Sequence, residues 1–546
     1  MSSESDKTVF EQSVEGQDNV NLFESKKYTY ITDSSSANGQ FNGQIQFDLN
    51  TLSSQNQWTS LSEAIITFPV KLTVKNGSVA TAPAAMTINS ATIKNGFHQF
   101  VDSLQIVIGG TTIQSSQIFT NIDTNYKILT EWSQDTLQKY GAALGIALDD
   151  VDMSYTDSSS GATESLDNAA LITANKGFDV MDYALNTGFK RRLNTFNNSS
   201  ASTLGRSILT TNQAVLGKSN VQTATVATAN ADNFVLYALG TIRLKDVSDA
   251  ISKMPLVKGL KGFIYLNYNS STHTLAGSTT TLSAAPVDRA VYGRCCPANL
   301  NLGTDGFSLG TTTDPVFSAD ISATASTSLT TATPIQTNAI LHAPYYVATP
   351  EVDRALTTRK TIRYCERFVS QFNMTASGSF NGSLSPGISN PKRVILYPYF
   401  TGAGASGNSG FLTNPLLSCF DGTPSTTSPF AAIKDLQVYV GNQPMYQSPV
   451  SQDWQTFLNE VSANGDNGGE IDQASSGLLS SRTWSQLYRY YTVDIGRRMN
   501  SEDGASKSIQ LSCSNATTCP MTVVAIIWYE REIVLDTASG MVTQSM

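Results

Sequence analysis

The stretch of sequence that decides the fold occurs twice. Residues 101–110 read VDSLQIVIGG and residues 433–442 read IKDLQVYVGN, at one constant offset and without a gap. The same offset pairs Leu104 with Leu436 and Ser116 with Ser448. Apolar residues alternate along the first eight positions of each copy, which predicts a strand with one buried face. The Gly-Gly and Gly-Asn pairs that follow supply the positive φ angles of a two-residue hairpin.

After each hairpin the apolar period changes from two to that of a helix. The positions involved are Ile118, Ile122, Tyr126 and Leu129, with Val450, Trp454, Leu458 and Val461 at the same offset. We expect Ser116 and the pair Ser448-Pro449 to cap the two helices. The first helix should end near Tyr140-Gly141, with the glycine just past its last turn. A unit of strand, tight turn, strand and helix that is used twice predicts two similar domains.

Three further landmarks repeat in the same order along the chain. They are Phe-Asn-Gly at 41–43 and 380–382, an apolar strand with an aromatic-Pro pair at 65–70 and 394–399, and a strand carrying an arginine pair at 188–193 and 495–499. Pro69 indicates that the first of the apolar strands is an edge strand or contains a bulge. Landmarks repeated in one order favour a tandem duplication.

Length and composition predict an all-β protein of two tandem β-sandwiches. The chain has 546 residues and only 14% charged residues, with many short alternating runs. This is too long for one ordinary core and fits two β domains of roughly 200 to 250 residues. We expect a flexible N-terminal arm at 1–20, a first sandwich at 21–348 with long loops at about 149–187, 194–230 and 270–338, a linker at 349–360, and a second sandwich with a C-terminal tail at 361–546.

Charge and hydropathy exclude several classes of protein. The net charge is −9 and no Lys/Arg-rich arm is present, so binding of nucleic acid by charge neutralisation is not expected. The first residues contain no apolar segment, so we expect no secretory signal. The longest strongly apolar run, 523–529, is too short to span a bilayer. Six cysteines in such a chain favour a reducing compartment over a disulfide framework.

No set of residues predicts a catalytic, cofactor or metal site. The acidic residues Asp149, Asp150, Asp152 and Asp157 are spaced loosely like a calcium loop, but the glycine and the terminal glutamate of that motif are missing. We interpret them as a solvated acidic loop. The cysteines lack zinc spacing and are interpreted as reduced thiols, although Cys513 and Cys519 could face each other across a hairpin. The histidines His98, His273 and His342 lie in separate segments, so structural roles are favoured over a triad assembled in space.

The recurring arginine pairs are the candidate interface residues. They are Arg191, Arg192, Arg497 and Arg498. One interpretation is that they are ordinary strand ends with solvated charges. The other is that they pair with acidic groups on a neighbouring domain or chain.

The order of these elements resembles the double jelly-roll major capsid proteins. The residues that carry the resemblance are 104–109 with the helix that follows, 244–259 with a short helix before Pro255, 390–398 and 436–461. The most similar group is that of polinton-like viruses and virophages, and the adenovirus hexon lineage is more distant. The resemblance implies two jelly rolls side by side, with short helices after each hairpin.

The resemblance also implies a structural function without cofactors or catalysis. Homotrimers with a pseudo-hexagonal outline would tile an icosahedral shell around double-stranded DNA, and long loops would rise as outer towers. Neighbouring capsid trimers and minor capsid proteins, of penton or cement type, would be the partners, with no direct sequence-specific binding of nucleic acid. The protein would be assembled inside the infected cell and located in the virion. Three chains with two similar domains each present six similar sides, as a hexagonal lattice requires.

Two other interpretations of the sequence remain open. A tandem β-sandwich adhesin or carbohydrate-binding protein would need export, and the first residues offer no signal for it. A β-sandwich hydrolase would have the acidic residues at 149–157 as its only hint of acid-base groups. The mass in solution separates the trimer from a monomer that binds sugar.

Overall fold

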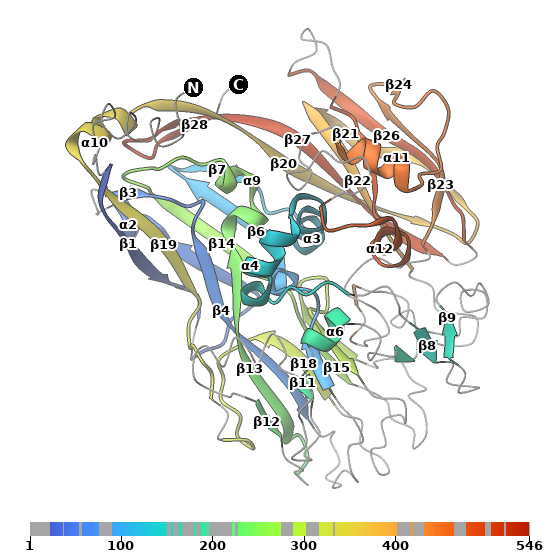
Figure 1. The fold of residues 1–546 in the computed structure, drawn as a ribbon, viewed down its shortest axis with the longest axis horizontal. Coiled ribbons are helices and arrows are strands. Elements are labelled where there is room, and N and C mark those ends of the chain that lie inside the picture. Colours follow the sequence, from blue (N-terminus) through green and yellow to red (C-terminus); the bar gives the residue numbers. More distant parts are fainter. Residues whose placement is uncertain are drawn as a thin grey trace, which may run out of the picture.

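The computed structural model is almost entirely antiparallel β structure with a few short helices (Figure 1). It describes residues 22–36, 38–53, 57–75, 90–149, 154–156, 163–165, 180–181, 187–192, 194–195, 221–223, 228–274, 288–301, 316–330, 333–400, 416–417, 419, 431–462, 477–496, 504–517 and 520–544. Within these ranges no helix is both long enough and apolar enough to cross a bilayer.

Two facing sheets form the first sandwich. The strands of its larger sheet that matter below are β1 (Phe23–Thr32), β19 (Ile340–Ala348), β4 (Ile65–Lys75) and β13 (Asp232–Arg243), paired in that order. The smaller sheet has the order β2 (Gln44–Asp48), β14 (Gly262–Tyr268), β6 (Val101–Ile108) and β7 (Thr111–Gln114). Their inward side chains, among them Phe68, Leu104 and Leu266, form one hydrophobic core.

The second sandwich is built in the same way. Its first sheet has the order β20 (Arg359–Met374), β27 (Met521–Asp536), β22 (Pro391–Phe400) and β25 (Tyr491–Asp494). Its second sheet has the order β21 (Ser379–Ser389), β26 (Ser506–Asn515), β23 (Ile433–Val440) and β24 (Gln443–Pro444). Val394, Leu436 and Val523 are buried in the core between them.

The two sandwiches have the same topology. If these eight strands of each half are counted along the chain, the first sheet has the order 1-8-3-6 and the second has the order 2-7-4-5, in both halves. Two four-stranded antiparallel sheets joined in this way are a jelly roll. None of the described sheets combines strands from before Thr349 with strands after it. The tandem duplication expected from the sequence therefore extends to strand pairing.

Both predicted hairpins are present. β6 and β7 are joined by Gly109 and Gly110, at φ 58° and 80°, and β23 and β24 are joined by Gly441 and Asn442, at φ 56° and 66°. Two successive positive φ angles match the right-handed twist of the flanking strands. This is why glycine or asparagine occupies all four positions.

The helices that follow the hairpins are present, but their predicted ends were wrong. The helices are α3 (Thr120–Glu131), α4 (Gln134–Leu144) and α11 (Trp454–Ser462). Ser116 does not cap α3, since its hydroxyl lies 2.8 Å from that of Ser103. At the start of α11 it is Asp453, not Ser448, that accepts a hydrogen bond from the Thr456 amide. Gly141 lies inside α4, and Gly145, at φ 69°, ends that helix.

The region 270–338 contains more structure than predicted. It includes β15 (Ser270–Thr274), β16 (Asp288–Tyr292), β17 (Ala298–Asn301) and β18 (Val316–Ile321). β18 pairs with β4, and β15 and β16 extend the same sheet. Phe317, Ala319 and Ile321 point into the core, so a run rich in small polar residues still has an apolar face. β4 is therefore a central strand, and the edge position predicted from Pro69 was wrong. β19 pairs with residues 65–67 of β4 and β18 pairs with residues 70–75, so Pro69 lies between the two pairings.

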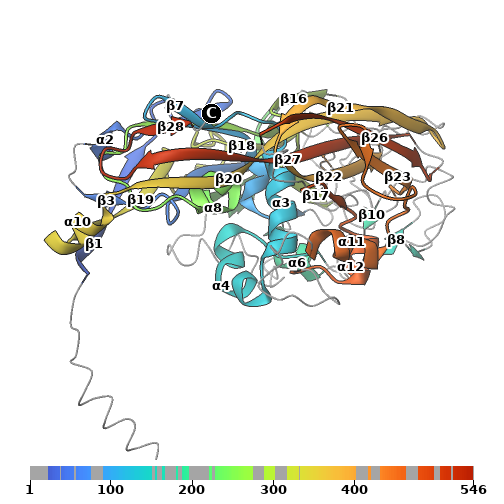
Figure 2. The same cartoon turned by 90° about the horizontal axis from the view of Figure 1, so that it is seen from above.

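The remaining elements are short. The expected linker contains α10 (Pro350–Leu356) and the start of β20, and the short helix expected before Pro255 is present as α8 (Leu244–Val247) and α9 (Asp249–Ser252). The others are α2 (Asn50–Ser53), η1 (Phe97–Phe100), α6 (Thr187–Arg192), α12 (Ser481–Gln486), β3 (Trp58–Thr59), β5 (Ser90–Ile93), β8 (Ser154–Thr156), β9 (Thr163–Ser165), β10 (Val180–Met181), β11 (Asn194–Thr195), β12 (Val221–Thr223) and β28 (Val542–Gln544). Figure 2 shows α3, α4, α11 and α12 gathered on one side of the sheets.

Candidate functional site at the junction of the two sandwiches

The two sandwiches are joined along a continuous two-stranded ribbon. β20 and β27 are 16 residues long each and pair along their whole length (Figure 1). At one end Ile362 and Ile533 belong to the first core, and at the other end Phe372 and Val523 belong to the second core. Because the same strands complete both cores, the sandwiches cannot separate without exposing apolar surface of each.

Helix α3 of the first sandwich covers the outer face of the first sheet of the second sandwich. It contributes Ile122, Tyr126 and Leu129, preceded by Phe119, to a cluster that is separate from both sandwich cores. The sheet side of this cluster includes Ile395, Tyr397 and Tyr399 of β22 with Val524, Ile526 and Trp528 of β27. Phe457 and Val461 of α11 belong to the same cluster. Burial of the four side chains of Phe119 and α3 stabilises the contact by roughly 6 to 12 kcal/mol before entropy is subtracted.

Asp123 is the polar centre of this contact. Its carboxylate accepts hydrogen bonds from Arg367 Nη1 at 3.0 Å and from Trp528 Nε1 at 2.7 Å, and it lies 3.5 Å from Lys127 Nζ. Burial raises the pKa of Asp123, but Lys127 and Arg367 outweigh burial and hold that pKa below its ordinary value. The carboxylate is therefore ionised and joins one strand pair to the helix.

A second buried carboxylate, Glu366 of β20, holds the start of the α3 connection. It accepts hydrogen bonds from the Ser115 amide at 2.7 Å and the Tyr529 hydroxyl at 3.0 Å, and it pairs with Arg531 at 2.5 Å. Burial raises the pKa of Glu366, but the hydrogen bonds from Ser115 and Arg531 outweigh burial and hold that pKa below its ordinary value. Asp249 of α9 makes a third contact of this kind, since its carboxylate accepts a hydrogen bond from the Cys365 amide at 2.6 Å.

Tyrosines and amides complete the junction around α3. Asn125 Nδ2 donates to the Tyr490 hydroxyl at 2.9 Å, and the Tyr126 hydroxyl lies 2.9 Å from Thr492 Oγ1. The Tyr126 ring also meets the Trp528 ring edge-on, at 5.9 Å between centroids. Such directional contacts allow one orientation of the helix on the sheet.

The structure divides the first arginine pair between interior and surface. Arg192 is buried, pairs with Asp149 Oδ1 at 2.5 Å and donates to the Ala147 carbonyl, whereas Arg191 is exposed. The Asp149 amide in turn donates to the hydroxyl of Tyr488, in the second sandwich. The prediction of a solvated loop was therefore wrong for Asp149.

The pair also lies in a helix. The predicted strand at 188–193 is α6, in keeping with the helix propensity of its lysine and arginines. The other predicted residues, Asp150, Asp152, Asp157, Arg497 and Arg498, lie outside the described residues.

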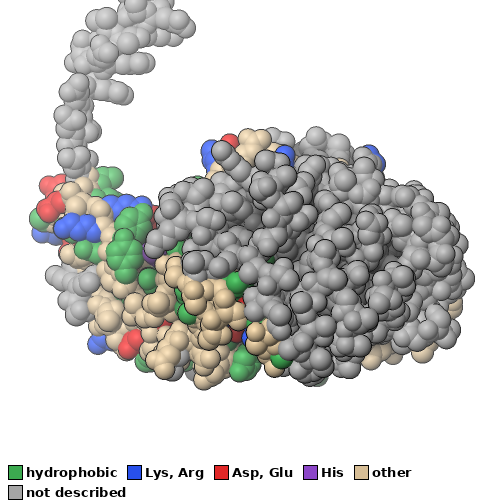
Figure 3. All heavy atoms as spheres, turned by 90° about the horizontal axis from the view of Figure 1, so that it is seen from below, with side chains coloured by type: hydrophobic (Ala, Val, Ile, Leu, Met, Phe, Trp, Pro, Cys, Tyr) green, Lys and Arg blue, Asp and Glu red, His purple; other side chains and the backbone are tan. Residues whose placement is uncertain are grey.

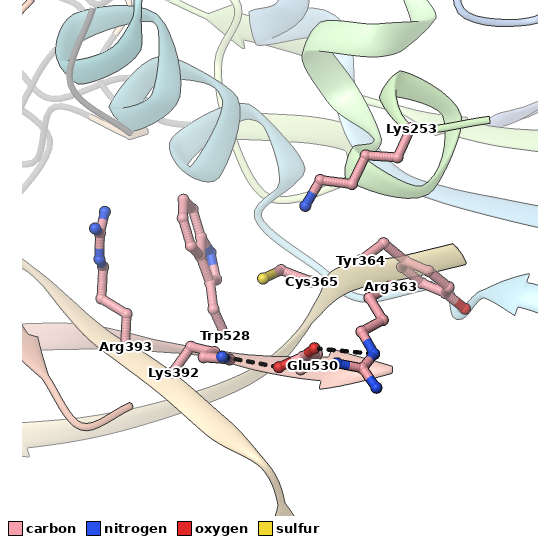
Figure 4. A pocket seen from close by; sticks show the side chains of 8 residues that line it. All are labelled: Lys253, Arg363, Tyr364, Cys365, Lys392, Arg393, Trp528 and Glu530. Atoms are coloured by element: carbon pink, nitrogen blue, oxygen red, sulfur yellow. Dashed lines mark ion pairs between the residues drawn. The ribbon is translucent and has the colours of Figure 1, made fainter. Parts of the chain in front are cut away.

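A basic pocket of about 210 Å³ opens at the seam between α9 and the second sandwich (Figure 4). Its lining consists of Lys253, Arg363, Tyr364, Cys365, Lys392, Arg393, Trp528 and Glu530. Glu530 lies between two of the cations, 2.8 Å from Lys392 Nζ and 3.9 Å from Arg363 Nε. Burial raises the pKa of Cys365, so its thiol is protonated and is a poor nucleophile. The pocket offers ion pairing, with no nucleophile and base in contact among its lining residues.

The fold brings together His273 and Cys296, which lie in different segments of the sequence. Burial raises the pKa of the Cys296 thiol, but His273 and Lys94 outweigh burial and lower it to about 6. Both side chains are fully buried, so no substrate can reach them. His273 lies in β15 and Cys296 lies in the segment before β17, so no local motif predicts this contact.

The other histidines and cysteines have structural surroundings. Burial lowers the pKa of His98 to about 3, and His342 lies 2.9 Å from Thr67 Oγ1 on the outer face of the larger sheet. None of the described cysteines forms a disulfide bond, and Cys519, the expected partner of Cys513, lies outside the described residues. Across the described ranges no group of three or more His, Cys, Asp or Glu side chains could hold a metal ion.

Comparison with known proteins places this geometry among viral capsid folds. No family model and no curated protein matches the sequence. The crystal structure of the mavirus major capsid protein superposes with a TM-score of 0.50 at 12% identity and covers 100% of this chain and 95% of that chain. The chain has the double jelly-roll fold. The resemblance and the fold class expected from the sequence are confirmed.

Other solved double jelly-roll structures match the chain at similar coverage. The Sputnik virophage structure gives a TM-score of 0.49 at 12% identity, over 96% of this chain and 89% of that chain. The Faustovirus major capsid protein gives 0.45 at 10%, over 97% and 94%.

Proposed function

We propose that this chain is the major capsid protein of an icosahedral double-stranded DNA virus and acts as a structural subunit, not an enzyme. The observation that carries the proposal is the presence of two jelly rolls of identical strand order, locked side by side by α3 and the β20–β27 ribbon. A rigid pair of similar units is what a pseudo-hexagonal tile needs, because three chains then present six similar sides.

The proposed partners follow from this role. Three copies form the tile, neighbouring trimers extend it into a shell, and minor capsid proteins of penton or cement type fill the positions that trimers leave. The connections at about 149–187 and 194–230 are longer than a sandwich needs to join its strands, which supports a place for them on the outer surface of the virion. The exposed Arg191 remains a candidate interface residue, as do Arg497 and Arg498.

Mass in solution tests the proposal. Purified protein should elute as a particle of about three times 58.6 kDa by light scattering, and negative-stain images should show six-sided outlines. A monomer at all concentrations would contradict the proposal, and a monomer that binds glycans would favour the adhesin alternative. Arg191→Glu, alone and with Arg497→Glu and Arg498→Glu, should reduce trimer yield if these residues lie at the interface.

A further inference from the structure

A polar pocket of about 330 Å³ opens on the outer face of the larger sheet of the first sandwich, and its lining residues all belong to that sandwich. The side chains used below are Lys71, Lys75, Thr272, Tyr292, Ser318 and Asp320. The two lysines alternate along β4 with Leu72 and Val74, which point into the core, so the lysines point outward. The pocket volume lies at the small end of the range for ligand sites, roughly 300 to 1,000 Å³.

Asp320 of β18 has hydrogen-bonding capacity that the chain does not use. Its Oδ1 atom is buried and has no hydrogen-bond partner among the described residues, although buried polar side-chain atoms are normally paired. Burial raises the pKa of Asp320 to about 7, so a large share of its carboxyl groups is protonated at neutral pH. A protonated carboxyl group both donates and accepts hydrogen bonds, as the hydroxyl group of a ligand does.

The charges of the pocket are balanced, which disfavours an anionic ligand. Lys71 Nζ donates to the Thr324 carbonyl at 3.0 Å, and Lys75 Nζ lies 3.8 Å from Asp232 Oδ1. Burial lowers the pKa of Lys71, and the carboxyl group of Asp320 opposes a second negative charge beside it. Figure 3 views the molecule from this end, and basic and acidic side chains are interspersed on the described part of its surface. This arrangement favours an uncharged polar ligand over a phosphate or a carboxylate.

Tyr292 of β16 adds an aromatic surface beside these polar groups. Its side chain is 46% exposed, and its ring packs on that of Tyr268 with 5.8 Å between the centroids. The hydroxyl groups of Thr272 and Ser318 lie 3.1 Å apart on the neighbouring strands. A sugar ring has an apolar C–H face and a rim of hydroxyl groups that donate and accept hydrogen bonds. An aromatic ring beside carboxyl, ammonium and hydroxyl groups matches both parts of such a ligand.

We propose that this pocket binds one uncharged sugar unit of a glycan, with the sugar ring against Tyr292 and a sugar hydroxyl group on Asp320. Figure 1 shows β15 and β18 at the end of the first sandwich opposite the chain termini, where β11 and β12 of the 194–230 connection also lie. That connection is proposed to face outward in the virion, so the pocket would be accessible to glycans on a cell surface. The inference goes beyond assembly, and only this outward orientation rests on the proposed function.

Saturation-transfer NMR on the full-length protein tests the site. The probes are methyl β-D-glucoside, methyl β-D-galactoside and methyl α-D-mannoside at millimolar concentration, and at least one should receive saturation at its ring protons. Asp320→Ala removes a carboxyl group with an unpaired oxygen, so the thermal midpoint should not fall, and the Kd of that probe should rise about tenfold. Tyr292→Ala should raise the Kd by a similar factor, roughly tenfold. Tyr140→Ala is the matched control, since Tyr140 is 45% exposed on α4, and it should bind as the wild type does.

The outcomes separate this inference from the proposed function. A wild-type protein that saturates none of the three probes would overturn the inference. An unchanged Kd in Asp320→Ala and Tyr292→Ala would also overturn it, as would an equal loss of binding in Tyr140→Ala. A trimer that binds no sugar would leave the proposed function intact. A monomer that binds sugar through Asp320 and Tyr292 would overturn the proposed function and support the inference.

Discussion

Substitution of Asp123 by asparagine tests how the two sandwiches are held together. The change keeps the shape of the side chain but removes the charge that Arg367 and Lys127 share inside the α3 contact. Loss of one partner from a buried ion pair costs about 3 to 5 kcal/mol, because the remaining charge stays buried without its counter-charge. For a folding unit of about 200 residues this lowers the melting temperature by roughly 6 to 20 °C.

Thermal unfolding, followed by circular dichroism and calorimetry, measures this effect. Asp135→Asn is the matched control, since Asp135 lies in the next helix and pairs with Lys139 at the surface, 2.6 Å away. Exposed pairs of this kind contribute little, so the control should melt within about 1 °C of the wild type. An Asp123→Asn protein that melts with the control would refute the reasoning that an ionised carboxylate locks α3 onto the sheet.

The pH dependence gives a second test of the same group. The folded pKa of Asp123 lies below the unfolded value, so its contribution is complete above the unfolded pKa and is lost as the pH falls toward the folded pKa. Wild-type stability should therefore decline below about pH 4, where an unfolded aspartate begins to bind its proton. The decline should be shallower in Asp123→Asn. The pKa of Glu366 is lowered in the same way, so some acid sensitivity should remain.

Three further predictions concern other parts of the chain. Arg192→Ala should destabilise the subunit by roughly 3 to 5 kcal/mol, measured by thermal unfolding, because it removes a buried cation from Asp149; a change under about 1 kcal/mol would contradict this pairing. Gly110→Ala should cost about 1 kcal/mol, since φ is 80° there and only the backbone conformation opposes the new methyl group, while Gly110→Asn should be better tolerated. Cys296 should react with a thiol reagent only after unfolding, despite its lowered pKa, because it is fully buried; rapid labelling of the folded protein would show that its surroundings open.

Some features were predictable because they depend on residues close together in the chain. The two hairpins follow from alternating apolar positions and from Gly109-Gly110 and Gly441-Asn442, whose φ angles are a local requirement. The repeat of this unit predicted two similar domains. The short helix before Pro255 was predicted for the same reason, since proline cannot continue a helix.

The sequence by itself therefore determined the kind of unit, its duplication and the fold class. Only the tertiary structure decided which element covers which face. Asp123 and Arg367 meet across two sandwiches, and His273 of β15 meets Cys296 of the segment before β17, because packing joins segments that no local pattern connects. The burial of Asp149 with Arg192 and the inclusion of β18 in the larger sheet have the same cause. The sequence does not show whether a charged residue or a polar run is buried or exposed, because its role depends on the partner that packing brings to it.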